Sequence, residues 1–108
     1  MGMNKPVAFP AVNKNTVVKN IRQAAALSEN ITITRHALER MRERGITRIE
    51  VNRCLQHGQL QGAVFKNEHD NWQAELMHTV AGKRLVVQAA LITEGQHSVI
   101  VVTTWRLA

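Results

Sequence analysis

The stretch from Thr34 to Gly45, TRHALERMRERG, gathers side chains that could act on a phosphate group. His36, Arg40 and Arg44 recur every four residues, which places them on one stripe of a helix. An imidazole can transfer protons near neutral pH, and the free N–H groups of a first helical turn attract phosphate. The same pattern also fits a solvated helix face on which neighbouring glutamates pair with the arginines. Both interpretations remain open at this point: a site with catalytic His36 and substrate-binding Arg40 and Arg44, or a plain surface.

A second candidate site follows from alternation in the C-terminal half. After Gly58 the sequence alternates apolar and polar side chains, which indicates strands with one face toward the helices and one open face. In the last strand this rule places Thr103 and Trp105 toward the helices. The polar parity predicts an open-face set that forms the second candidate site: Lys66, Gln73, Arg84, Gln88 and Arg106. Cations on separate strands repel one another unless an anion binds between them, although such residues also protect open strands from aggregation.

Three helices are predicted before this sheet. They cover about 15–28, 34–44 and 47–57. Thr34 and Thr47 are suited to cap the second and third helices, and Thr47 has capping-box spacing to Glu50. Gly45 is suited to end the second helix. The segment NITIT between the first two helices is expected to be an extended link.

Four strands are predicted at about 61–67, 72–80, 83–92 and 98–106. Their short connections are rich in turn-forming residues, which favours an antiparallel meander. The expected fold is therefore α+β, with three N-terminal helices packed on one face of a four-stranded antiparallel sheet. We expect a flexible arm at 1–12, which carries both prolines, and a single domain at 13–108.

Composition points to a polyanionic partner. The chain has 108 residues, a net charge of +6 and an isoelectric point near 10.5, which is typical of proteins that meet nucleic acid. The single cysteine, Cys54, lies in an apolar helical pattern, excludes an internal disulfide and favours the cytoplasm. No run has membrane-spanning length. The remaining histidines lack metal-site spacing, and His78 fits a buried position, so neither metal nor cofactor is expected.

The motif ITRHALERMRERGITRIEV resembles the opening of the family known as domain of unknown function 4258. Its His-Ala-x-x-Arg-x-x-x-Arg-Gly-Ile signature corresponds to residues 36–46, and the likeness covers about residues 31–105. That family is grouped with the RelE-like toxin superfamily. The resemblance implies a RelE-like ribonuclease toxin fold.

A more distant likeness is to the MqsR messenger-RNA interferase toxins, carried by VFK at 64–66, NWQ at 71–73 and TWR at 104–106. It implies that Lys66 and Gln73 match the family's lysine and glutamine and that Arg106 stands for its C-terminal lysine. The family's tyrosine has no counterpart, because the chain contains no tyrosine.

These observations lead to a functional hypothesis with two alternatives. The first expectation is a metal-independent endoribonuclease, the toxin of a toxin–antitoxin pair, with RNA as substrate and an acidic antitoxin as partner. The alternative is a non-catalytic basic module of the same fold that binds nucleic acid or a protein. A small accessory protein of a phage or plasmid, basic only for solubility, is the third.

Overall fold

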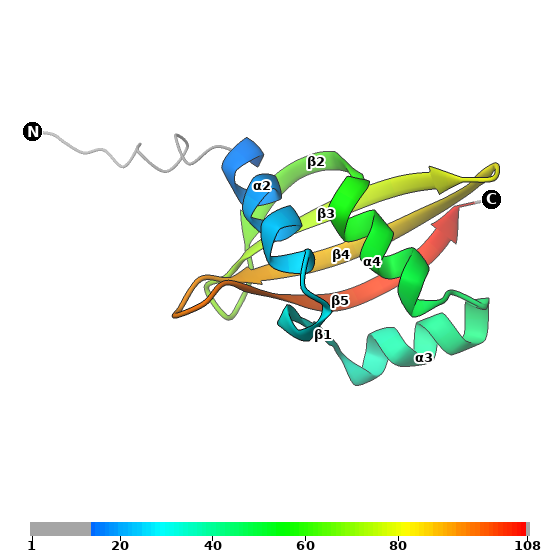
Figure 1. Ribbon diagram of the computed structural model, residues 1–108, viewed down its shortest axis with the longest axis horizontal. Helices are drawn as coiled ribbons and strands as arrows, with labels where there is room; N and C mark the ends of the chain where they lie inside the picture. Colours follow the sequence, from blue (N-terminus) through cyan, green and yellow to red (C-terminus); the bar gives the residue numbers. More distant parts are fainter. Residues whose placement is uncertain (1–13, 108) are drawn as a thin grey trace, which may run out of the picture.

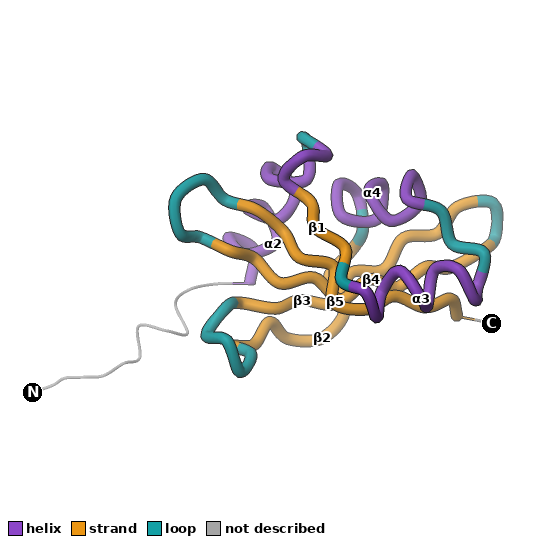
Figure 2. Tube along the Cα trace, turned by 90° about the horizontal axis from the view of Figure 1, so that it is seen from below, coloured by secondary structure: helices purple, strands orange, loops and turns teal. Residues whose placement is uncertain are grey.

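The protein is an α+β domain in which helices cover one face of a sheet (Figure 1). The structure is a computed structural model that describes residues 14–107, and the predicted arm at 1–12 lies outside them. Helices α2 (Lys14–Ala25) and α4 (Arg48–His57) lie across the sheet, whereas α3 (Arg35–Arg44) runs along its β5 edge (Figures 1 and 2). Among the described helices, none combines the length and apolar character that crossing a membrane requires.

The helix ends lie where the capping residues predicted them. The Thr34 hydroxyl accepts a hydrogen bond from the Ala37 N–H at 3.0 Å. Gly45 ends α3 in the left-handed region at φ 65°. Thr47 and Glu50 form a complete capping box at the start of α4. These predictions are confirmed. Each cap is a local interaction, so its partners can be identified from the sequence alone.

The predicted sheet is wrong in strand number and direction. It has five strands in the order β1-β5-β4-β3-β2, and β1 pairs parallel to β5. The extra strand lies within the NITIT segment, at Ile31–Ile33, and directly follows a short 3-10 helix (Ser28–Asn30). A three-residue strand is too short to show an alternating pattern, so it was expected to be only a link. The strands are β1 (Ile31–Ile33), β2 (Gln59–Lys66), β3 (Trp72–Val80), β4 (Lys83–Ile92) and β5 (Ser98–Leu107).

The hydrophobic core lies between the sheet and helices α2 and α4. Ile21 of α2 and Leu55 of α4 are fully buried against Leu76 and Val87 of the central strands. Cys54 belongs to the same core, and its thiol donates to the Leu76 carbonyl at 3.4 Å. Burial raises the pKa of Cys54 to about 12. The prediction that Cys54 is a core residue is confirmed.

A β-bulge at Val102 changes which face the end of β5 presents. Ala89 pairs with Val101, but Gln88 pairs with Thr103, which leaves Val102 without a partner on β4. The Val102 carbonyl instead accepts a hydrogen bond from the Thr34 hydroxyl at 3.1 Å. Alternation therefore reverses after Val101.

The reversal overturns the predicted orientation of the β5 side chains that follow Val102. Thr103 and Trp105 pair with the open-face residues Gln88 and Val86, so they lie on the open face rather than toward the helices. Thr104 is fully buried and donates to the Val86 carbonyl at 2.7 Å. Arg106 lies on the helix side. A sequence pattern cannot show a bulge, because the extra residue becomes evident only when the partner strand is known.

Candidate nucleic-acid interface

Arg106 does not lie on the open face where it was predicted. Its Nη2 donates to both carboxylate oxygens of Glu50 at 3.1 Å and to the Gly45 carbonyl at 3.0 Å. The side chain thus joins the end of β5 to α4 and to the turn between α3 and α4. Arg106 is separated from the predicted open-face set by the sheet itself.

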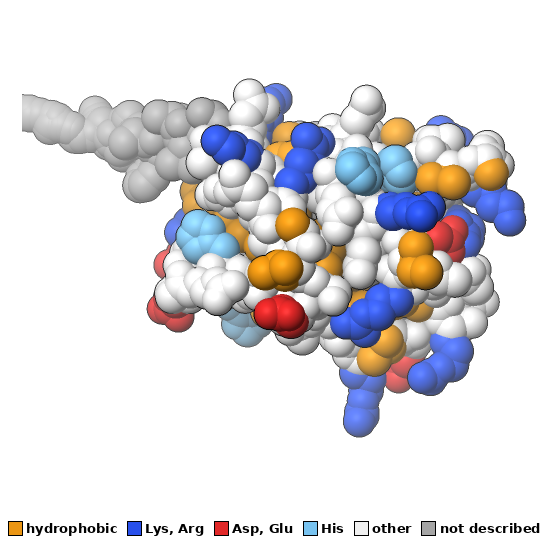
Figure 3. Space-filling view, viewed as in Figure 1, with side chains coloured by type: hydrophobic (Ala, Val, Ile, Leu, Met, Phe, Trp, Pro, Cys, Tyr) orange, Lys and Arg blue, Asp and Glu red, His pale blue; other side chains and the backbone are white. Residues whose placement is uncertain are grey.

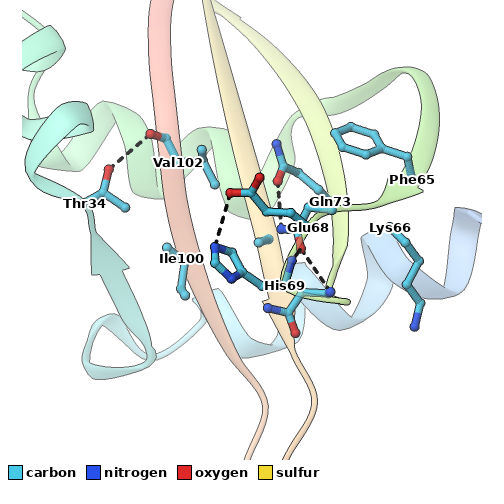
Figure 4. Close-up of a pocket in the computed structure, with 11 residues that line it drawn as sticks. Thr34, Phe65, Lys66, Glu68, His69, Gln73, Ile100 and Val102 are labelled. Atoms are coloured by element: carbon cyan, nitrogen blue, oxygen red, sulfur yellow. Dashed lines mark hydrogen bonds and ion pairs between the residues drawn. The ribbon is translucent and has the colours of Figure 1, made fainter.

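Lys66 is also turned away from the predicted set. It pairs with Trp72, which packs against the helix-side core, and its Nζ lies 5.2 Å from the centre of the Trp72 ring. The same Nζ lies 3.2 Å from the Asp70 carboxylate. Figure 4 shows the Lys66 side chain pointing away from Gln73. The expected convergence of Lys66, Gln73 and Arg106 is therefore wrong.

Gln73 and Gln88 do share the open face and contact each other. The Gln73 amide donates to the Gln88 side-chain oxygen at 2.8 Å and accepts from Asn67 at 3.0 Å. Gln88 in turn donates to Glu75 at 3.2 Å. This chain of amides satisfies itself, and Gln73 is nearly buried. The network is better suited to stiffening the sheet than to binding substrate.

A hollow of about 630 Å³ lies beside Gln73 on the open face (Figure 4). Phe65, Ile100 and Val102 give it apolar walls, and the loop at 67–71 supplies its polar rim. Lys66, which also lines the hollow, has its ammonium group paired with Asp70. The hollow therefore lacks the cluster of cations that a phosphate chain requires.

The remaining predicted residues are dispersed. Arg84 pairs with Thr79, six residues along β3 from Gln73, a distance of about 20 Å. His36 and Arg44 are exposed on α3, along the edge of the sheet opposite to Lys66. Arg40, on the same helix, is ion-paired with Glu43, as the solvated-face interpretation expects. The structure brings Gln73 and Gln88 together and keeps the others apart.

Basic side chains gather at one end of the molecule. This basic end comprises the last turn of α3, helix α4 and the strand ends beside them, and it holds Arg42, Arg44, Arg48, Arg53, Lys83, Arg84 and Arg106. The carboxylates in these segments, Glu43 and Glu50, are already ion-paired. At the other end, the loops at 67–71 and 93–97 carry Glu68, Asp70 and Glu94. Figure 3 shows Lys and Arg side chains over the half that carries the C-terminus, and further ones at the upper left, over α2.

A small groove of about 30 Å³ at the basic end is lined by His78, which the sequence analysis assigned to a buried position. Arg53 of α4 faces His78, Lys83 and Arg106 of the sheet across this groove. His57, the last residue of α4, lies beside His78, with 6.1 Å between the ring centroids. Figure 3 shows two adjacent histidine side chains on this face. The alternation of β3 correctly predicted that His78 faces the helices, but the side chain is partly buried rather than buried.

Gly58 allows α4 to approach β3 closely enough to bring these rings together. A Cβ at Gly58 would lie 2.5 Å from the Cys54 carbonyl oxygen and 3.1 Å from the Met77 carbonyl oxygen. Arg22 of α2 donates to the Gly58 carbonyl at 2.7 Å and holds this junction in place. The sequence signal for the pair was the i, i+4 spacing of Arg53 and His57 followed by glycine.

Glu50 lines the groove and holds Arg106 in place. Its pKa is lowered, first by the hydrogen bond from the Thr47 backbone N–H and further by Arg106. A folded-state pKa below the ordinary value means that the charged form contributes stability above pH 4.5, and that this contribution is lost as pH falls through the folded pKa.

Glu50→Gln is therefore expected to cost about 1 kcal/mol at pH 7, because it weakens both the cap and the Arg106 pair. The difference from wild type should shrink as pH falls below 4.5, because the unfolded chain takes up the proton before the folded protein does. Urea unfolding at about pH 7 and about pH 3.5 measures this, with Glu43→Gln as the matched control on an exposed pair. An equal difference at both pH values would contradict the assigned role.

Comparisons with known proteins give a family. A family model described as Domain of unknown function (DUF4258) matches residues 33–106, and the chain belongs to this family. No match to the chain was found among curated proteins or among solved structures. Within residues 14–107, no three His, Cys, Asp or Glu side chains are grouped as a metal site would need.

Proposed function

We propose that this member of the DUF4258 family binds single-stranded RNA through its basic end. The observation that carries the proposal is the segregation of charge, with seven cations gathered at one end of the domain and both nearby carboxylates already paired. Such a patch attracts phosphates and releases counterions when they bind. It would account for a net charge of +6 better than solubility alone.

A single strand fits this end better than a duplex. Trp105 is partly exposed on the open face, one cross-strand row from the exposed Arg84. An indole beside a guanidinium suits a base stacked on the ring with its phosphate on the cation, which is how single strands are bound without sequence preference. An unpaired base is required for such stacking.

Charge reversal tests the proposal. The variant Arg44→Glu/Arg48→Glu is expected to bind a labelled RNA of about 20 nucleotides at least roughly tenfold more weakly in fluorescence anisotropy. The slope of log affinity against log salt should fall by about 1.4, because roughly two phosphate contacts are lost. The matched control, Lys14→Glu/Lys19→Glu, makes the same charge change on exposed residues of α2 and is expected to change affinity less than about threefold. Equal losses of RNA affinity in the two variants would show that binding depends on the overall charge and not on the basic end. The same titration with duplex DNA shows whether a single strand is preferred.

An endoribonuclease is the second candidate function. The resemblance to RelE-like and MqsR toxins suggests it, but the catalytic set inferred from that resemblance is dispersed in this fold. The observation that favours the activity is instead the His57–His78 pair among cations. In a toxin–antitoxin pair, the expected acidic antitoxin segment would cover the basic end and compete with RNA there.

A further inference from the structure

We propose that His57 and His78 are the acid/base pair of an RNA-cleaving site beside the groove between α4 and the β3–β4 hairpin. The proposal rests on RNA binding at the basic end and adds a reaction and its residues. Both rings reach the surface, since His57 is exposed and His78 is partly exposed. The ring centroids lie 6.1 Å apart with the ring planes tilted by 38°, so a phosphate that contacts one ring lies near the other.

The groove supplies cations for the phosphate that would lie between the rings. Arg53 is one helical turn from His57, and Lys83 lines the same groove. Within residues 14–107, no ion pair or side-chain hydrogen bond occupies the charged groups of Arg53 or Lys83. By contrast, Arg106 is held by Glu50, which fixes it as a wall of the groove. Arg53 and Lys83 are thus available to neutralise a phosphate.

The reaction is transfer of the phosphate to the neighbouring ribose hydroxyl. One neutral imidazole accepts the 2′-hydroxyl proton as the bond from O2′ to phosphorus forms. The other imidazole, protonated, donates its proton to O5′ as the bond from phosphorus to O5′ breaks. The products are a 2′,3′-cyclic phosphate and a 5′-hydroxyl. Arg53 and Lys83 stabilise the extra negative charge of the transition state.

The pair requires one ring in each protonation state, so the rate should follow a bell-shaped curve with pH. The charged groups near the two histidines come from the elements packed around the pair. They are Arg22 of α2, Glu50 and Arg53 of α4, Lys83 of β4 and Arg106 of β5. All but Glu50 are cations, and Glu50 is neutralised by Arg106.

The test separates cleavage from binding. Wild type, His57→Gln and His78→Gln are incubated in excess chelator with a labelled RNA of about 30 nucleotides, and products are assayed for 2′,3′-cyclic phosphate. Affinity is measured in parallel on the same sequence with 2′-O-methyl groups, which cannot react. Each variant is expected to cleave at least about 100-fold more slowly, to lose one limb of the pH profile and to bind within about threefold of wild type. His69→Gln, an exposed histidine at the other end, serves as the control with unchanged cleavage.

Each of the other outcomes would overturn either the catalytic assignment or both proposals. If wild type binds the methylated RNA but does not cleave, the catalytic assignment falls and RNA binding stands. If wild type neither binds nor cleaves, both proposals fall. Cleavage retained in both variants would move the reaction to another site. His78→Asn is a second replacement for the partly buried position, and far-ultraviolet circular dichroism shows whether each variant is folded.

Discussion

Deletion of Val102 is expected to lower the free energy of unfolding by roughly 1–3 kcal/mol, because the bulge that anchors the start of α3 is lost. Deletion makes Val101 and Thr103 neighbours that pair with Ala89 and Gln88 in a regular ladder, so Thr104, Trp105 and Arg106 keep their faces. The loss therefore comes from the bulge itself rather than from a changed register. The Thr34 hydroxyl loses the bulge carbonyl that anchors the start of α3.

Urea unfolding followed by tryptophan fluorescence measures this loss. The matched control is deletion of Glu94, an exposed residue of the β4–β5 loop, which is expected to cost less than about 1 kcal/mol. Near-ultraviolet circular dichroism reports whether the environment of Trp105 has changed. Equal unfolding midpoints for the two deletions would show that the Val102 bulge does not anchor the start of α3.

Gly58→Ala is expected to cost about 1–3 kcal/mol and to weaken RNA cleavage more than RNA binding. The added Cβ meets two backbone carbonyl oxygens, those of Cys54 and Met77, and neither can rotate away as a side chain would. The 2.5 Å contact forces the backbone at the end of α4 to shift, and the 3.1 Å contact favours a shift away from β3. Since His57 precedes Gly58 and His78 follows Met77, the movement separates the two rings.

Gly95→Ala is the control for this substitution. Gly95 has φ 67°, but no atom lies within 4 Å of the position that a Cβ would take, so alanine there adds backbone strain of roughly 1 kcal/mol without a clash. It lies in the loop at 93–97, far from His57 and His78. Thermal unfolding and the two RNA assays compare the variants. A Gly58→Ala protein as stable and as active as wild type would rule out the close approach of α4 to β3 as the basis of the site.

Local structure in this protein follows from the amino-acid sequence alone. Thr34, Gly45 and Thr47 set the ends of α3 and α4, because a cap needs only partners within a few residues along the chain. Alternation located the four long strands, and composition indicated a polyanionic partner. The shared face of Gln73 and Gln88 also followed from alternation, since β3 and β4 pair without a bulge between them.

Which side chains meet depends on the tertiary fold. The face of Arg106 depends on an unpaired Val102, and that bulge is tied to Thr34, 68 residues earlier in the chain. The parallel pairing of β1 with β5 likewise joins distant residues, such as Ile31 and Val99. The meeting of His57 with His78 depends on α4 packing over β3 at Gly58. Local sequence encodes caps and alternation, whereas strand register and helix packing are set by contacts between distant segments, and these place the groove at the basic end.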